Sequence, residues 1–334
     1  MSHCWNLPLI HFATLDTIEE SRPVALICSR GTWEAVNDRL SLSVSSSHEI
    51  TEATIESWDA LCEEVTGDVI YAVGGGLAVD AAKYVAVKKG LPLVSIPTAI
   101  SVDAFLTWAS GYREDGCVKY LETKPPDEVY VDYEVIANGP PTIQVAGITD
   151  VMSIATGRWD WKYAHDHGKN TEGMEYDSNI DAMAKTILDA VLDAADSMGR
   201  LEPVGIKRLV ECLAMEVQLC NFIGHSRPEE GSEHYFAYAA EDVLGKGLPH
   251  GDLVGPGIAI MAELQGQDTA PLIKAMQKCR VPLTNIHEDT TIEILEGLPD
   301  YCRRHEFPHG RAHELTTEEI ESAVVNLRKS LDCF

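Results

Sequence analysis

The chain has 334 residues, 45% of them hydrophobic, which is enough for two domains of ordinary size with complete cores. Its formal net charge is −27, from 53 acidic and 26 basic residues. A surface this acidic repels nucleic-acid phosphates and anionic lipids, so we expect neither nucleic acid nor membrane as a partner. An anionic ligand would need local basic groups or helix N-termini.

Two further features narrow the class of protein. Nine scattered cysteines with no C-x-x-C pair predict reduced thiols rather than a disulfide framework. The first residues, MSHCWNLPLIHF, lack a cationic segment and a sustained apolar core, and no stretch reaches membrane-spanning length. We therefore expect a cytoplasmic protein that acts on a small-molecule substrate.

Before Pro140 and Pro141, short β-branched runs alternate with helical patterns. The alternation predicts strands at residues 23–28, 69–73, 93–96 and 128–132, helices at about 52–65 and 77–89, and a loop at the serine cluster 41–47. This pattern is typical of a Rossmann-like α/β nucleotide-binding domain with a parallel sheet, which we place at residues 1–141.

Three consecutive glycines, Gly74, Gly75 and Gly76, follow the strand predicted at 69–73. Glycines can adopt positive φ and let backbone N–H groups approach a pyrophosphate, which the positive end of the following helix also attracts. Gly90 is the expected end of that helix. The triplet predicts a cofactor cradle, although a bare glycine turn is equally consistent with a tight connection.

Polar residues after the glycines strengthen this interpretation. Asp80 and Lys83 are three positions apart on the helix and share a face near the loop, although a solvated ion pair is the alternative. Thr98, Ser101 and Asp103 follow the next strand. Because the carboxyl ends of parallel strands meet at one edge, we expect these side chains near the cofactor.

After Pro141, amphipathic helical patterns dominate, for example at residues 180–198 and 204–223, with almost no strand signal. We expect an all-helical domain at residues 142–334. A cleft between two such domains is the default place for an active site.

The helical part holds three candidate metal ligands. Asp150 lies in a predominantly apolar helix start, where an unpaired carboxylate would be costly to bury, so it requires a partner. His234 follows Gly-Ser-Glu at a predicted helix entrance, and His250 directly precedes Gly251. One carboxylate and two imidazoles suit Zn²⁺ or another divalent first-row ion, although a single histidine taken alone is more often an ordinary residue.

Five segments carry a resemblance over most of the chain: GGGLAVDAAK (74–83), SIPTAISVD (95–103), AGITDVMSIATGRWDW (146–161), SRPEEGSEH (226–234) and LPHGDLVGPG (248–257). They resemble the iron-containing alcohol dehydrogenase and dehydroquinate synthase superfamily, and within it the glycerol-1-phosphate dehydrogenases. The resemblance implies a dehydroquinate synthase-like fold and an NAD(P)-linked oxidoreductase that acts on the CH–OH group of a small polyol or polyol phosphate.

The resemblance also implies roles for single residues. The metal ligands of relatives correspond to Asp150, His234 and His250, with Zn²⁺ preferred over Ni²⁺ or Fe²⁺. Some relatives add a fourth ligand, a histidine, where this chain has Ile154, so a three-ligand site is expected. Asp103 matches a residue beside cofactor and metal, and would hydrogen-bond a substrate hydroxyl; the alternative is that it caps a helix at 104–108.

Two departures leave the substrate open. Glycerol-1-phosphate dehydrogenases usually have histidines where this chain has Val102 and Tyr238. A different polyol, polyol phosphate or aldehyde is therefore an alternative to glycerol 1-phosphate. The second alternative is a dehydroquinate synthase-like cyclase, which is disfavoured because those enzymes use glutamate at the position of Asp150. The third is a non-catalytic nucleotide-binding relative, which is disfavoured because this chain retains all three types of metal ligand.

The end of the first predicted strand concerns the choice between NAD and NADP. NAD-specific folds place a carboxylate there for the ribose 2′-hydroxyl, whereas an arginine accommodates a 2′-phosphate. This chain has Ser29 and Arg30, so we expect it to tolerate or prefer NADP, with a solvated Arg30 as the alternative. The oligomeric state is open, a homo-oligomer included.

Overall fold

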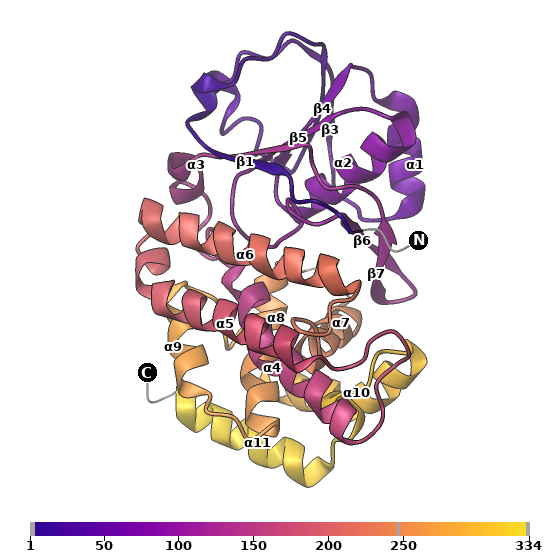
Figure 1. Cartoon of the computed structure of the whole chain (residues 1–334), viewed down its shortest axis with the longest axis vertical. Helices are drawn as coiled ribbons and strands as arrows, with labels where there is room; N and C mark the ends of the chain where they lie inside the picture. Colours follow the sequence, from indigo (N-terminus) through magenta and orange to yellow (C-terminus); the bar gives the residue numbers. More distant parts are fainter. Residues whose placement is uncertain (1–3, 246–247, 332–334) are drawn as a thin grey trace. The chain divides into compact units, whose positions relative to one another are not determined.

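The computed structural model describes residues 4–245 and 248–331. The chain divides into two compact units, of which the first ends at Val145 and the second begins at Ala146 (Figure 1). Among the described residues, no helix combines the length and the apolar character needed to cross a membrane.

The first unit is built on a six-stranded sheet in the order β1-β8-β5-β4-β2-β3, and every neighbouring pair is parallel. The strands are β1 (Leu9–Phe12), β2 (Val24–Cys28), β3 (Val44–Glu49), β4 (Val69–Gly74), β5 (Leu93–Pro97) and β8 (Glu128–Val131). Gly74 pairs in register with Pro97, so the glycine turn and the segment after β5 leave the sheet side by side.

The sequence predicts the central strands of this sheet but not its edge strands. Every residue of β2, β4 and β5 is buried, which is why their aliphatic runs are visible in the sequence. The loop predicted for the serine cluster is wrong from Val44 onward, because β3 is an edge strand there. Its mostly exposed polar side chains carry no apolar signal, while its backbone hydrogen bonds come from β2.

Helices and a hairpin complete this unit. They are α1 (Ile55–Glu64), α2 (Gly76–Lys89), α3 (Tyr133–Ala137), the short turns η1 (Leu15–Thr17) and η2 (Asn37–Arg39), and the antiparallel pair β6 (Ala109–Glu114) and β7 (Cys117–Glu122). The hydroxyl of Thr54 accepts a hydrogen bond from the N–H of Ser57 and starts α1. Gly90, at φ 65°, ends α2 as predicted.

The second unit is all helical over its described residues. Its elements are α4 (Ile148–Asp166), α5 (Ser178–Gly199), α6 (Pro203–Ile223), α7 (Ser232–Leu244), α8 (His250–Leu264), α9 (Ala270–Lys278), α10 (Glu288–Arg304), η3 (Arg311–His313) and α11 (Thr317–Leu331). The helices predicted at 180–198 and 204–223 are confirmed as α5 and α6. The mostly buried helix α4 contacts α5, α7 and α8, so it forms the centre of this unit.

Candidate metal centre and cofactor cradle

The three residues predicted to bind a metal lie together in the second unit. Asp150 is in the first turn of α4, His234 in the first turn of α7, and His250 is the first residue of α8. One potential ligand atom from each lies within 4.8 Å of the others. The His250 Nε2 atom is 3.0 Å from Asp150 Oδ1, and the two imidazole centroids are 5.3 Å apart.

Glycines allow this convergence, because α8 approaches both partner helices closely. A Cβ atom on Gly251 would lie 3.0 Å from the Cβ of Ala146, just before α4. A Cβ atom on Gly257 would lie 2.5 Å from the carbonyl oxygen of Glu233 on α7. A side chain at position 257 would therefore push α8 away from α7 and separate His250 from His234.

Glu233 orients one of the imidazoles. Its side chain is fully buried, and its Oε1 accepts the N–H of Gly231 at 2.7 Å and lies 2.9 Å from His234 Nδ1. Burial alone would lower the pKa of His234, but the hydrogen bond and charge of Glu233 raise it to about 9. With Nδ1 engaged by the carboxylate, Nε2 is the nitrogen left for an ion.

Asp160 holds the start of α7 in place through hydrogen bonds. This buried carboxylate on α4 accepts hydrogen bonds from the backbone N–H groups of Ser232 (2.7 Å) and Arg311 (2.8 Å) and from Gln265 Nε2 (3.1 Å). Burial raises the pKa of Asp160, and the charge of Glu233 adds to the effect. These hydrogen bonds link α4, η3 and the end of α8 to the turn that carries His234.

The donor set fits a divalent ion. One carboxylate and two imidazoles from separate helices can share one ion whose bonds are about 2.0–2.2 Å long. Ile154, one turn after Asp150, is buried and supplies no donor atom, as the three-ligand prediction requires. These donors alone do not select one first-row metal over another.

The glycine turn in the first unit has two glycines that the fold itself requires. Gly74 has φ +140°, and a Cβ there would lie 2.4 Å from Ser29 Oγ. A Cβ on Gly76 would lie 2.9 Å from Val102 Cγ2. Gly75 differs, because its φ is −93° and the nearest atom to a Cβ would be Ser101 Oγ at 3.5 Å, an ordinary contact. Gly75 is the N-cap of α2, where an anion meets free N–H groups.

Other predicted cofactor residues divide between the turn and the interior. Ser29 Oγ accepts the N–H of Gly75 at 3.3 Å, so its hydroxyl faces the turn, whereas Arg30 is exposed. Thr98 and Ser101 follow β5 and are partly exposed. Asp80 is 2.9 Å from the Nζ of Lys83, so the two residues do pair, but Lys83 is fully buried and the alternative of a solvated pair is wrong.

Asp103 lies in a turn, not before a helix. Its carbonyl oxygen accepts the N–H of Leu106 at 2.7 Å, and no helix is present at residues 104–108. The N-cap interpretation of Asp103 is therefore wrong.

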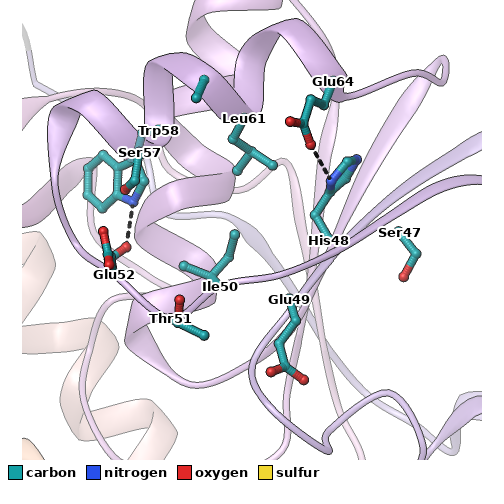
Figure 2. A pocket seen from close by; sticks show the side chains of 11 residues that line it. Ser47, His48, Glu49, Ile50, Thr51, Glu52, Ser57, Trp58, Leu61 and Glu64 are labelled. Carbon is teal, nitrogen blue, oxygen red and sulfur yellow. Dashed lines mark hydrogen bonds and ion pairs between the residues drawn. The ribbon is translucent and has the colours of Figure 1, made fainter.

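A separate pocket of about 360 Å³ lies between the end of β3 and α1 in the first unit (Figure 2). It contains none of the predicted site residues. Glu49, Glu52 and Glu64 are among its lining residues, and His48 Nδ1 is 3.6 Å from Glu64 Oε2. Three carboxylates make it unsuitable for a phosphate, so the glycine turn remains the candidate pyrophosphate site.

Sequence alone missed Glu233 and Asp160 as members of the site. Glu233 directly precedes His234 inside the Gly-Ser-Glu-His motif, so its position was a usable signal. Asp160 could be found only as an acidic residue in a buried helix pattern, and its partners lie far away in sequence.

Part of the chain matches a family model, and most of the chain is similar to a known dehydrogenase. Residues 12–140 match the family model described as iron-containing alcohol dehydrogenase. A glycerol-1-phosphate dehydrogenase (NAD(P)+) from Methanothrix thermoacetophila is 30% identical over 248 residues, which is 73% of this chain and 69% of the relative.

Solved structures show the same fold. A probable glycerol dehydrogenase from Sinorhizobium meliloti matches with a TM-score of 0.72 and 19% identity, over 99% of each chain. A 2-epi-5-epi-valiolone synthase from Streptomyces hygroscopicus, with NAD+ and Zn2+ bound, matches with a TM-score of 0.66 and 15% identity, over 97% of each chain.

Proposed function

Because the chain belongs to the iron-containing alcohol dehydrogenase family, we propose that it is a metal-dependent, NAD(P)-linked dehydrogenase of a small polyol or polyol phosphate. The observation that carries this function is the convergence of Asp150, His234 and His250 within 4.8 Å. A protein that only bound a nucleotide would not require three metal-ligand side chains to converge from three separate helices.

The metal chemistry belongs to the second unit. A divalent ion held by the three ligands would supply Lewis-acid polarisation of the substrate's carbinol or carbonyl oxygen. Glu233 keeps the His234 ring oriented through Nδ1, and Asp160 fixes the helix start that carries both residues. The site is therefore pre-organised before substrate arrives, which is the protein's contribution to electrostatic catalysis.

The cofactor belongs to the first unit. NAD(P) would supply the hydride acceptor for alcohol oxidation, or the donor for carbonyl reduction. The N–H groups at the start of α2 would bind its pyrophosphate, and Gly75 leaves room for the approach. Asp103 is proposed to accept a hydrogen bond from a substrate hydroxyl, as the family motif suggests.

The finer assignments are Zn²⁺ as the metal and glycerol 1-phosphate or a related polyol phosphate as the substrate. Similarity to a glycerol-1-phosphate dehydrogenase over 73% of the chain supports a phosphorylated substrate. Val102 and Tyr238 replace two histidines of those enzymes, so the hydrogen bonds offered to the substrate differ.

Absorbance of the reduced nicotinamide tests the function. The chain, stripped of metal and reloaded with Zn²⁺, Ni²⁺ or Fe²⁺, is assayed with NAD and NADP against matched polyols and polyol phosphates. Metal-dependent turnover of at least one of them is expected. No turnover of any with any metal, in a folded chain that binds cofactor, would contradict the proposal.

A further inference from the structure

Lys83 lies seven residues into α2 from Gly76 and is fully buried. We infer that Lys83 is a positioning residue, which holds the segment of residues 100–108, with Ser101 and Asp103, against the glycine turn and so sets the geometry of hydride transfer without touching cofactor or substrate. The inference rests on the proposed function, because it assigns Lys83 to the support of that function's residues.

The ammonium group of Lys83 is surrounded by backbone oxygens from this segment and the strand after it. Nζ donates to the carbonyl oxygens of Ala104 at 3.0 Å and Thr107 at 3.4 Å, and to that of Ala109, the first residue of β6. Asp80 Oδ1 lies 2.9 Å from the same nitrogen and supplies the compensating charge. A buried ammonium is stable only when so satisfied.

These contacts exclude the role that a lysine beside a glycine loop often has. A lysine of that kind reaches bound phosphates with a mobile ammonium group. The Lys83 side chain has no exposed surface, and its ammonium hydrogens point at carbonyl oxygens. It therefore cannot act as a phosphate ligand without breaking the contacts that stabilise it.

The other end of the segment also rests on α2. Val102 Cγ2 occupies the space beside Gly76, where a Cβ would be only 2.9 Å away, and Ser101 Oγ lies beside Gly75. Gly76 and Lys83 are seven positions apart on the helix, a rise of about 10 Å. One rigid helix thus holds the segment at two points, with Asp103 between them.

Asp80 extends the support into the hairpin. Its carboxylate accepts the backbone N–H of Gly111 on β6, and its carbonyl oxygen accepts the hydroxyl of Ser110 at 3.1 Å. Burial raises the pKa of Asp80, and Lys83 opposes the rise. Removal of Lys83 would take away the nearest counter-charge of this carboxylate and the donor to the carbonyl oxygens of residues 104, 107 and 109.

The test compares Lys83→Met with Lys89→Met, a matched change at an exposed position of the same helix. In the metal-loaded enzyme, Lys83→Met should lower kcat by at least about tenfold, towards the roughly 100-fold loss that a 1 Å misplacement can cause, while Lys89→Met stays near wild type. Metal content should be unchanged in both variants.

A double-mutant cycle with Asp103→Ala separates positioning from general destabilisation. If Lys83 acts through the segment that carries Asp103, then Lys83→Met should lower kcat far less in the Asp103→Ala background than in wild type. Equal fold losses in the two backgrounds would overturn the inference. An Asp103→Ala variant with wild-type kcat would instead remove Asp103 from the proposed function.

Amide hydrogen exchange keeps the inference testable if Lys83→Met folds poorly or the enzyme proves inactive. The variant Asp80→Asn/Lys83→Met removes both charges, and its peptides covering residues 100–108 should exchange at least about tenfold faster than in wild type, while peptides of α4 stay unchanged. Unchanged exchange at 100–108 in the folded double variant would show that Lys83 does not hold the segment.

Discussion

The Nε2 atom of His250, at the first residue of α8, lies 3.0 Å from Oδ1 of Asp150 in the first turn of α4. The two atoms belong to prospective ligands of the same ion. An ion would bind both atoms at once and would link α4 to α8. Metal binding should therefore stabilise the second unit as well as enable the reaction.

Metal should stabilise wild type much more than it stabilises Asp150→Asn. At a free Zn²⁺ concentration about 100-fold above the dissociation constant, linkage gives wild type about 2.7 kcal/mol of extra stability. Asp150→Asn has nearly the same shape but lacks the charge, so it should gain much less. Denaturant unfolding with and without Zn²⁺ measures both values, and equal gains would exclude Asp150 as a ligand.

Glu233→Gln should weaken metal binding about 10-fold to 100-fold, because the orienting carboxylate at His234 Nδ1 is lost. Competition with a chelating dye measures the affinity directly. Glu296→Gln, at an exposed position of α10, is the matched control and should bind metal like wild type. Identical affinities for Glu233→Gln and the control would show that the contact has no influence on the ion.

Gly75→Val should weaken cofactor binding at least about tenfold while the chain stays folded. The fold accepts a Cβ at this position, since its nearest neighbour would be Ser101 Oγ at 3.5 Å, but the pyrophosphate must approach the same backbone. Titration with the reduced cofactor, followed by fluorescence, gives the affinity. An unchanged dissociation constant would show that the glycine triplet is only a tight turn and does not bind the pyrophosphate.

The enzyme should accept NADP, with Arg30 contributing to its binding. Arg30 is exposed after β2, no carboxylate follows that strand directly, and Ser29 is engaged with Gly75. Comparison of kcat/KM for the two cofactors, in wild type and Arg30→Ala, measures the preference. A preference for NAD of tenfold or more, about 1.4 kcal/mol, that survives loss of Arg30 would rule this out.

Acid should destabilise the second unit partly through His225. Its Nδ1 accepts the N–H of Arg227 at 3.3 Å, and burial, followed by the charge of Arg227, lowers the pKa of His225 from 6.5 to about 4. The unfolded chain takes up this proton below pH 6.5 and the folded chain does not. The stability that neutral His225 contributes is therefore present above pH 6.5 and is lost as the pH falls towards 4.

His225→Gln should reduce the loss of unfolding free energy between pH 7 and pH 4.5 by on the order of 2 kcal/mol, after allowance for the partial exposure of the ring. His287→Gln, with a highly exposed ring, should leave the pH dependence unchanged. Urea unfolding at the two pH values gives the difference. The same loss in wild type and His225→Gln would contradict the assignment.

Residues whose neighbours lie close in sequence were the predictable ones. The buried runs of β2, β4 and β5, the glycine turn and the start of α2 all follow from local pattern. The strand β3 did not, because an edge strand with mostly exposed serines has no apolar alternation. Its structure comes from hydrogen bonds to β2, which sequence pattern does not encode.

The site residues show the same difference between features set by local sequence and features set by distant contacts. Motifs pointed to Asp150, His234 and His250, and the structure brings these three together. The spacing of Asp80 and Lys83 predicted their pairing but not the burial of the lysine, because the carbonyl oxygens that enclose it come from residues 104–109. Contacts between distant segments decide whether such a pair is exposed or structural.

The most direct measurement is the metal content of purified wild type and His250→Ala by elemental analysis, read beside NAD(P)-dependent turnover and circular dichroism. Wild type should hold one divalent ion per chain and turn over a polyol or polyol phosphate. His250→Ala should be folded, depleted of metal and inactive. Full metal occupancy in a folded His250→Ala would contradict a metal centre formed by Asp150, His234 and His250.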